Sequence, residues 1–406
     1  MDNILKAKYD LKELELNSLL EITQAINNNL SEESLYKIFN FTLRANLNIK
    51  KLALYVLDEK WNCKVNFGSD NDFFQIPIDP KFLERNQVTL IDKEDKDNPF
   101  SEFDKALPVA HKDKLMAYVF VGDQKKTTLN EPEVNATLIQ TLSNIIIVAI
   151  ENKKLARRQL REEALRKEME IAKNVQRLLF PKKLPYNDRL RINASYIPHQ
   201  AIGGDYYDYI ALDQDSFLLC IADVSGKGVP AAILMSNFQA SLHTLIRKTH
   251  DLKEIIEELN FQIMQNGDGE NFITFFVALY RNDENKLTYV NAGHNPPLII
   301  KGDKWIRLDK GTTVLGAFPQ LPFLEVGEED GMDSFFFFGY TDGLTELFNE
   351  RDEEYGIQRL ERFIRNNQHL NLKEMHEKLI RELNDYKGPR GYQDDITILT
   401  CKVGNV

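Results

Sequence analysis

Acidic residues beside apolar runs are the feature of this 406-residue sequence that most clearly suggests chemistry. Asp205 follows two glycines in "GGDYYD", Asp223 ends "CIAD", Asp342 ends "FFGYTD", and Asp394 and Asp395 precede "ITILT". A lone aspartate before a glycine is usually only a turn residue. Several carboxylates at one sheet edge, however, repel one another unless a cation offsets their charge. Because Mg²⁺ and Mn²⁺ prefer oxygen ligands, the pattern predicts a metal site.

Glycines accompany two of these acidic positions. Gly203 and Gly204 form a pair, and Gly226 and Gly228 flank Lys227. Glycine permits backbone angles and close approaches that a side chain forbids, which suits binding of a metal or a phosphate. A nucleotide-binding P-loop is disfavoured, because its pattern GxxxxGK[ST] needs glycine at position 221 and serine or threonine at 228. This chain has isoleucine and glycine there.

The elements that must position these residues lie in the second half of the chain. Strand-like runs rich in Val, Ile, Tyr and Phe recur from residue 189 onward, including "LRINASYIP", "SFLLCIADV", "ITFFVALYR", "SFFFFGYTD" and "ITILTCKV". Helices are predicted at about 230–248, where Pro230 suits a first helical position, at 251–266 and within 357–386. Strands stacked on strands with helices outside predict an α/β/β/α sandwich.

Five motifs in this half resemble one family. In order, "GGDYYD", "ADVSGKGVPAAILM", "NAGHNPPLI", "GYTDGLTE" and "DDITIL" resemble the metal-dependent PPM serine/threonine phosphatases of the bacterial SpoIIE/RsbU type. The preceding "EIAKNVQRLLFPKKLP" is similar to the segment that leads into such domains. The resemblance implies a PPM-type phosphatase domain over residues 185–406.

The family's metal ligands carry over position by position. The resemblance implies that Asp223 bridges two Mn²⁺ or Mg²⁺ ions and that the main-chain carbonyl of Val224 binds one of them. Asp342 and Asp394 would complete the shell of the other ion. Asp205 would serve the second metal directly or through water. These four aspartates are the expected catalytic residues.

Two further aspartates have less definite roles. Asp208 is expected to be a nearby supporting carboxylate. Either Asp394 or Asp395 could be the ligand, and the match to an Asp followed by Asn or Asp, a hydrophobic residue and Thr favours Asp394. Since no acidic position of the motifs is missing, we expect an active enzyme.

The implied reaction is direct hydrolysis of a phosphoester. Two ions about 3.5 to 4 Å apart bind phosphate oxygens and acidify a water for in-line attack on phosphorus, without a covalent phosphoenzyme. His294 could protonate the leaving oxygen, but with Asn291 it is more simply expected to hold the Asn-Pro-Pro turn by hydrogen bonds. Lys227 could attract a phosphate or be an exposed turn lysine. The family suggests a phosphorylated regulatory protein as substrate, such as an anti-sigma-factor antagonist of the STAS type.

The first half of the chain shows a different pattern. Apolar positions at helical spacing over residues 11–30, a capping box at "SEES" and a helix at 33–46 precede strand-like runs and a closing helix from about 131. The segments "LLEITQAINNNLSEESLYKIFNFTLRANLNIKKLALYVLDE", "KLMAYVFVGD" and "NATLIQTLSNIIIVAIEN" resemble a GAF domain. We therefore expect a GAF-like sensory domain over 11–152, with no ligand residue implied, and an α+β fold for the chain as a whole.

A charged segment joins the two halves. Residues 153–184 begin with "KKLARRQLREEALRKEMEIAKNVQRLLF", which contains neither Gly nor Pro and predicts one long helix ended by "FPKKLP". Leu165, Ala172 and Leu179 recur at heptad spacing, so a short coiled coil and a homodimer are one interpretation. A solvated connector helix that packs on its own domains is the other. A signal from the first domain would reach the phosphatase through this helix.

Composition restricts the function classes. The net charge of −11 disfavours a nucleic-acid surface, and therefore a nuclease or phosphodiesterase acting on a polynucleotide. Three scattered cysteines indicate buried thiols in a reducing compartment, and no apolar run approaches the roughly 20 residues that span a bilayer. We expect a cytoplasmic protein without membrane contact. The main alternative is a ligand-sensing scaffold with an inactive phosphatase-like domain.

Overall fold

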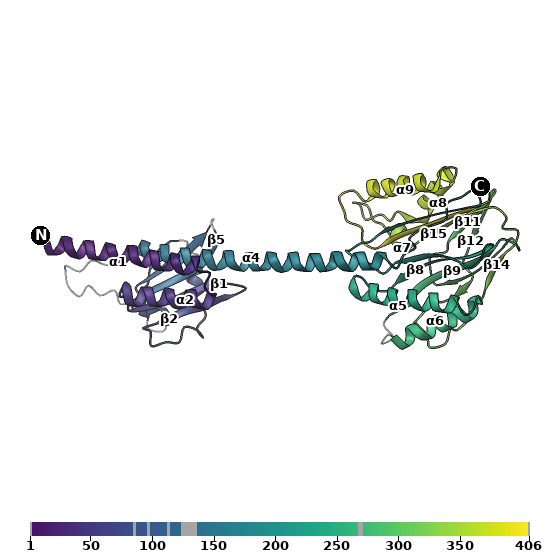
Figure 1. Ribbon diagram of the computed structural model, residues 1–406. Coiled ribbons are helices and arrows are strands. Elements are labelled where there is room, and N and C mark those ends of the chain that lie inside the picture. Colours follow the sequence, from purple (N-terminus) through teal and green to yellow (C-terminus); the bar gives the residue numbers. More distant parts are fainter. Residues whose placement is uncertain are drawn as a thin grey trace. The chain divides into compact units, whose positions relative to one another are not determined.

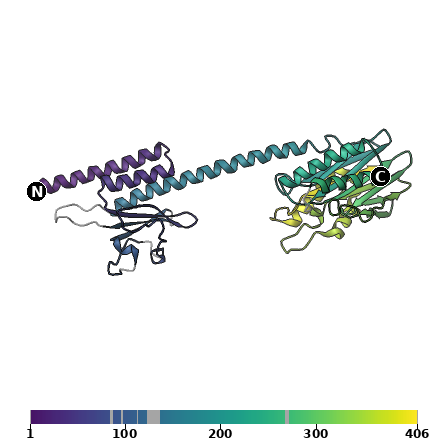
Figure 2. The ribbon, with the colours of Figure 1, turned by 90° about the horizontal axis from the view of Figure 1, so that it is seen from below.

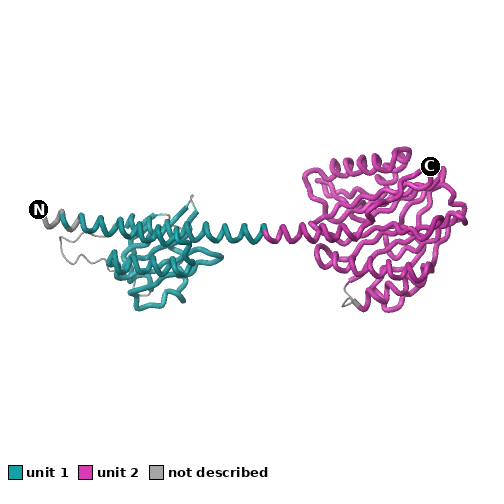
Figure 3. The backbone as a smooth tube through the Cα atoms, viewed as in Figure 1, with its two compact units in different colours: residues 1–163 teal, residues 164–406 magenta. Residues whose placement is uncertain are grey.

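The computed structural model describes residues 2–83, 87–95, 98–111, 114–122, 136–266 and 271–404. The chain forms two compact units, residues 1–163 and 164–406 (Figure 3). Both units mix helices and strands, which confirms the α+β prediction. Among the helices so described, none is both long enough and apolar enough to cross a membrane.

The first unit begins with two helices that cover one sheet face. These are α1 (Asp2–Asn27) and α2 (Glu32–Phe41), and a π-helical turn, η1 (Thr42–Asn46), follows. Ser31 caps α2, because its side chain accepts a hydrogen bond from the Ser34 amide, so the predicted N-cap is confirmed. The predicted capping box is wrong, because the residue three positions after Ser31 is Ser34 and not a glutamate. The helix expected at 33–46 is therefore α2 plus this turn.

An antiparallel sheet of five strands forms the rest of this unit, in the order β2-β1-β5-β4-β3. The strands are β1 (Lys51–Leu57), β2 (Trp61–Phe67), β3 (Thr89–Leu90), β4 (Lys105–His111) and β5 (Lys114–Gly122). Two short helices, α3 (Pro80–Leu83) and η2 (Pro99–Glu102), lie in its connections. Our sequence interpretation missed β4, whose Pro108 is tolerated because only two residues of β3 pair with that edge.

Each face of this sheet carries its own core. The helical face packs Ile22, Phe39, Leu54 and Ile146, among others, from α1, α2, β1 and α4 (Figure 2). The opposite face is filled by aromatic side chains that include Tyr55, Phe73, Phe100, Phe103 and Phe120. Both faces are therefore covered by the unit's own residues.

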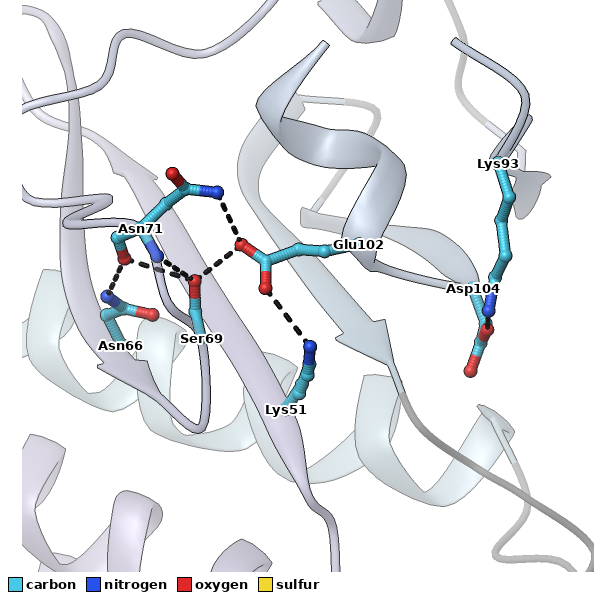
Figure 4. A network of polar contacts seen from close by, with 7 residues as sticks. All are labelled: Lys51, Asn66, Ser69, Asn71, Lys93, Glu102 and Asp104. Atoms are coloured by element: carbon cyan, nitrogen blue, oxygen red, sulfur yellow. Dashed lines mark hydrogen bonds and ion pairs between the residues drawn. The ribbon is translucent and has the colours of Figure 1, made fainter. Parts of the chain in front are cut away.

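Polar contacts fasten the connections of the aromatic face (Figure 4). Glu102 accepts hydrogen bonds from Lys51, Ser69 and Asn71 at 3.3, 2.5 and 3.1 Å, and thereby ties η2 to β1 and to the loop after β2. Lys93 and Asp104 form a separate ion pair, at the right of the view. Side-chain hydrogen bonds and an ion pair thus hold these connecting loops in place.

Helix α4 (Ala136–Arg177) is 42 residues long and belongs to both units. It confirms the prediction of one helix without interruption through residues 153–177. The expected start near 131 lies outside the described residues, as does the end of "KLMAYVFVGD" at 123. Whether the first unit is a GAF domain, and whether the domain limits are 11–152, 153–184 and 185–406, stay predictions.

The second unit is a sandwich of two sheets between two helical layers (Figure 1). One sheet contains β7 (Tyr206–Ala211), β8 (Ser216–Val224), β9 (Ile273–Arg281), β10 (Lys286–Ala292), β13 (Gly311–Thr312) and β14 (Gly327–Glu329). The other contains β6 (Leu190–Ile197), β11 (Leu298–Lys301), β12 (Lys304–Arg307), β15 (Phe335–Tyr340) and β16 (Ile396–Val403). The predicted α/β/β/α sandwich is confirmed.

Helices cover both outer faces of this sandwich. The first pair, α5 (Val229–Ile246) and α6 (Leu252–Asn266), packs on the β7–β10 sheet, and α8 (Gly356–Asn367) and α9 (Leu372–Lys387) pack on the β15–β16 sheet. A one-turn helix, α7 (Asp342–Thr345), follows β15. Cys220 and Cys401 are buried and Cys63 is half-buried, all as free thiols.

Candidate active site

The five aspartates singled out by the sequence lie at comparable positions in the sandwich. Asp205 immediately precedes β7, Asp223 is next to last in β8, and Asp342 begins α7 directly after β15. Asp394 and Asp395 immediately precede β16. One sheet supplies the first two and the other sheet the last three, so the site lies where the ends of the two sheets meet.

Asp205 joins the two sheets from a buried position, with 1% of its surface exposed. Its Oδ2 accepts hydrogen bonds from the hydroxyls of Thr341 and Thr397, at 2.8 and 2.6 Å. Burial first, and then the charges of Asp223 and Asp395, raise the pKa of Asp205 well above its usual value. The two threonines therefore fix one oxygen of a carboxylate that is short of positive charge.

Asp223 has the clearest electrostatic signature in the group. Burial and the neighbouring charges of Asp342, Asp394 and Asp395 raise its pKa to about 7, although a hydrogen bond with Asp205 acts in the opposite direction. Burial and Asp394 likewise raise the pKa of Asp342. The structure thus brings all five aspartates within mutual electrostatic range, as the strand-end pattern predicts.

Asp394 and Asp395 differ in how their oxygens are engaged. The two carboxylate oxygens of Asp395 accept the backbone N–H groups of His199 and Gly204, both at 2.7 Å. Asp394 is half-exposed; its Oδ1 accepts the Asp395 backbone N–H at 2.9 Å, and its Oδ2 lies 2.7 Å from the Lys227 Nζ. Asp395 therefore holds the loop that carries Asp205 from a buried position, whereas Asp394 is the one of the pair that solvent reaches.

Gly203 and Gly204 lie where a side chain would collide with neighbouring atoms. A Cβ on Gly203 would lie 1.8 Å from Oδ2 of Asp395, and a Cβ on Gly204 would lie 2.8 Å from the Val224 carbonyl oxygen. Any larger residue would push the Asp205 loop away from both contacts. The glycines allow the close approach that the sequence interpretation anticipated.

Asp208 is buried and holds β7 against α5. It accepts hydrogen bonds from the Tyr206 hydroxyl and, at 2.7 Å, from the Tyr209 amide, and the His243 Nε2 lies 2.6 Å from its Oδ2. The role of Asp208 here is to fasten the strand that begins just after Asp205. His243 is a partner that the sequence did not indicate, because only the fold brings α5 to this strand.

His294 maintains a turn. Its backbone N–H donates to the Asn291 side chain at 2.8 Å, and its Nδ1 lies 2.7 Å from the Thr274 hydroxyl, which confirms the expected hydrogen-bonding role. Burial lowers its pKa to about 3, and the Tyr340 backbone offsets this effect only in part. A side chain that stays neutral at ordinary pH is a poor proton donor to a leaving group.

Two further residues at the site had no assigned role. Gln176, near the end of α4, donates its side-chain N–H to the Gly203 carbonyl at 2.7 Å from a buried position. Lys227 donates to the Gln393 carbonyl at 2.7 Å besides pairing with Asp394. The charge of Lys227 and its two glycine neighbours had marked it in the sequence as a possible phosphate-binding residue. Nothing in the sequence marked Gln176, whose position at the site is known only from its contact in the fold.

The donor set fits a hard divalent cation in type. Within the described ranges, no three His, Cys, Asp or Glu side chains are arranged to hold an ion as they stand, since threonines, backbone amides and Lys227 engage several of the oxygens. Gathered carboxylates with raised pKa values nevertheless gain from any cation that neutralises them. Their oxygens are the ligands that Mg²⁺ and Mn²⁺ prefer.

Comparison with known proteins points to one family. The family model described as Stage II sporulation protein E (SpoIIE) matches residues 213–404. The chain is 31% identical over 248 residues to the phosphoserine phosphatase RsbU of Bacillus subtilis, across 59% of this chain and 71% of that protein. It is 27% identical over 242 residues to the protein IcfG of a Synechocystis species, of which it covers 37%.

A solved structure shows the same fold as the second unit. The SiaA-PP2C domain of Pseudomonas aeruginosa superposes with a TM-score of 0.54 at 20% identity, across 59% of this chain and 98% of that domain. At that identity the likeness concerns the fold alone. It agrees with the two-sheet sandwich described above.

Proposed function

Because this chain belongs to the RsbU-like SpoIIE family of PP2C-type phosphatases, we propose that its clustered aspartates hydrolyse phosphoserine and phosphothreonine on a regulatory protein. The chain is a phosphoprotein phosphatase of the serine/threonine class, since family and fold agree. The observation that supports this site is the pKa of Asp223, raised to about 7 by burial and three carboxylates. Such perturbed acids mark functional centres.

Two Mn²⁺ or Mg²⁺ ions are the cofactors that we propose for this centre. Asp205, Asp223, Asp342, Asp394 and the Val224 carbonyl would hold them, because their oxygens lie at the sheet ends, where burial and neighbouring carboxylates raise the pKa values of Asp205, Asp223 and Asp342. When bound, a metal pair supplies charge to the phosphate and acidity to a water. Asp395 is left out of the ligand set, since both its oxygens already accept backbone hydrogen bonds.

The chain's own residues then hold this centre in place. Thr341 and Thr397 fix one oxygen of Asp205, Oδ2, by hydrogen bonds. Asp208 anchors β7 through His243, and Gly204 lets the Val224 carbonyl approach. These contacts preorganise the oxygens before substrate arrives, which is where most catalytic stabilisation originates.

We propose a phosphorylated regulatory protein, such as one of the STAS type, as the substrate, and the cytoplasm as the location. A relative named phosphoserine phosphatase supports the substrate class. Three free thiols are consistent with a reducing compartment. The test is phosphate release from phosphorylated STAS proteins, with and without Mn²⁺; no release with the metal present would contradict the proposed substrate.

Regulation by the first, GAF-like unit and assembly as a homodimer complete the proposal. Helix α4 exposes a series of apolar side chains to solvent, namely Leu155, Leu160, Leu165, Ile171 and Val175. Such residues on a charged helix favour a partner helix. Leu179, by contrast, packs on the core of the second unit and is not available to a partner. The dimer is tested by the mass of the full chain in solution by light scattering, and a monomer would exclude it.

A further inference from the structure

A groove between α8 and α9 lies on the outer helical layer of the second unit (Figure 1). Its volume is about 290 Å³, close to the lower limit of small-molecule sites. Phe363 and Asn367 contribute buried side chains to the lining. The remaining lining side chains are exposed and belong to Arg359, Arg362, Asn366, Lys378 and Glu382. None of these residues belongs to the aspartate cluster of the candidate active site.

Three cations border the groove, and within the described ranges none of them forms an ion pair with a carboxylate. Neutral atoms hold two of them instead. The Arg359 Nη1 donates to the Glu354 carbonyl at 2.6 Å and to the Tyr386 hydroxyl at 2.9 Å. The Lys378 Nζ donates to the Asn367 Oδ1 at 2.8 Å. Neutral acceptors fix the position of a cation without removing its charge, so the groove stays positive in a chain of net charge −11.

The one carboxylate of the lining, that of Glu382, does not neutralise Lys378. These two residues are one turn apart on α9, yet their side chains contact opposite ends of α8. Glu382 accepts the hydroxyl of Tyr355, the residue before α8, at 2.7 Å, whereas Lys378 contacts Asn367, the last residue of that helix. The end of the groove near Asn367 is therefore the more positive one.

Helix stabilisation does not account for Arg362. A basic residue in the last turn of a helix interacts favourably with the helix dipole, and in α8 that residue is Arg365, which also lies over the Trp305 ring. Arg362 precedes this turn, and its guanidinium makes no hydrogen bond or ion pair with any residue that the structure describes. Its donors are thus available to a ligand in the groove.

The donors of the groove match a doubly charged anion. A phosphate dianion presents oxygens in several directions, so the Arg362 guanidinium, the Lys378 ammonium and the Asn366 amide can each donate to a different one. A carboxylate carries a single charge on two coplanar oxygens, which one arginine satisfies by itself. Two cations on two helices therefore favour a phosphate group over a carboxylate.

We infer that the groove between α8 and α9 binds a phosphate group, either as free phosphate or at the end of a phosphomonoester. Arg362 and Lys378 supply the two positive charges, and Asn366 donates from its side-chain amide. This site does not rest on the proposed phosphatase function, since its residues lie outside the aspartate cluster.

The test is binding of inorganic phosphate and of O-phosphoserine to the full-length, metal-free protein, followed by ligand-observed NMR, with acetate as the comparator. Without metal the carboxylates of the active site repel phosphate, so they do not contribute to the signal. At about pH 8 phosphate is a dianion and should bind more tightly than acetate. Binding should weaken at about 1 M salt, where the Debye length is about 3 Å. The tighter of the two phosphate probes identifies a free or an esterified ligand.

Arg362→Gln should weaken phosphate binding about tenfold or more, because a charged hydrogen-bond donor is lost. Lys378→Gln should have a similar effect. Lys373→Gln is the matched control, because it removes the same charge from another, exposed face of α9 that does not line the groove. It should leave the affinity unchanged.

Stability separates a lost ligand contact from a folding defect. Because Arg362 has no protein partner among the described residues, Arg362→Gln should unfold at the same temperature as the native chain, whereas Lys378→Gln loses its bond to Asn367 and should unfold at a slightly lower one. Three results would each overturn the proposed site: no binding of either phosphate probe at millimolar concentration, acetate binding as tight as that of phosphate, or equal weakening by Lys373→Gln and Arg362→Gln.

Discussion

At the scale of single residues, the aspartates of the active site divide by what their oxygens already bind. Both carboxylate oxygens of Asp395 accept hydrogen bonds from backbone N–H groups. In Asp205, the Oδ2 atom accepts hydrogen bonds from two threonine hydroxyls. Burial and neighbouring carboxylates raise the pKa values of Asp205, Asp223 and Asp342. These three therefore store repulsion that a cation would relieve, while the hydrogen bonds of Asp205 and Asp395 organise the site.

Asp223→Asn separates activity from stability. Loss of a central ligand should lower kcat for a phosphoserine peptide in Mn²⁺ buffer by at least about a hundredfold, since metal stabilisation of the transition state amounts to several kcal/mol. The metal-free protein should unfold at the same or a higher temperature, because a repelling charge is removed. Asp342→Asn should behave alike, and Asp283→Asn, in the exposed β9–β10 turn at the other end of the sheet, should change neither quantity. Full activity in either active-site variant would refute the metal assignment.

Lys227 lies 2.7 Å from an oxygen of Asp394, a residue that we propose as a metal ligand. Lys227→Met should therefore tighten Mn²⁺ binding by about fivefold, in line with the modest energy of a half-exposed ion pair. Calorimetric titration of Mn²⁺ into the purified protein measures this directly, without substrate. Lys248→Met, in the exposed turn after α5, is the control. Weaker Mn²⁺ binding in Lys227→Met would show that the lysine assists the metal.

His376 makes the second unit sensitive to acid. It is buried between Ser195 and Thr400, and burial lowers its pKa to about 3. The unfolded chain takes up this proton near pH 6.5, so the stability it contributes is lost as pH falls from about 6.5 toward 3. Urea unfolding should lose about 2 kcal/mol more between pH 6.5 and 5 in the native chain than in His376→Gln. Trp305 fluorescence in a Trp61→Phe background reports on this unit, and equal losses would contradict the shift.

At the scale of elements, the spacing of apolar residues and the positions of turn-forming residues predicted most of the strands and helices of the second unit. Apolar runs such as "SFLLCIADV" and "SFFFFGYTD" became β8 and β15 because both faces of each strand are buried. Short elements such as β12, β13 and α7 escaped, since a few residues carry no periodic signal. The partners of Asp205 and Asp208 also escaped, because Thr341, Thr397 and His243 lie 35 or more positions away in sequence.

Gln176 couples the end of α4 to the loop that carries Asp205. Gln176→Leu would leave the buried Gly203 carbonyl without its donor, a loss of about 1 to 3 kcal/mol. We expect lower phosphatase activity, on the order of tenfold, if a part of that energy holds the Asp205 loop in its productive position. Gln159→Leu, on an exposed part of the same helix, is the control. Unchanged kcat and KM in Gln176→Leu would mean that the contact serves packing alone.

At the scale of the whole molecule, the sequence indicated two functional halves. It did not indicate that the C-terminal end of α4 and the residues after it pack as part of the second unit. Phe180 packs on Tyr196, Tyr206 and Tyr207, at ring-centroid distances of 5.2, 6.1 and 5.0 Å. Together with Gln176 it makes the end of the linker part of the catalytic unit. A charged, heptad-like segment offers no sign of this, because its surface pattern is that of a solvated helix.

Two fragments distinguish a catalytic role of this segment from a purely connecting one. Residues 164–406 retain Gln176 and Phe180, whereas residues 185–406 lose both, together with about 1.5 to 3 kcal/mol or more of aromatic burial. We expect 185–406 to unfold at a lower temperature and to release phosphate from a phosphoserine peptide more slowly than 164–406. Calorimetric melting and initial rates at matched Mn²⁺ concentration measure both effects. Equal melting temperatures and rates of the two fragments would show that this segment only connects the two units. Regulation of the phosphatase would then have to act through residues other than Gln176 and Phe180.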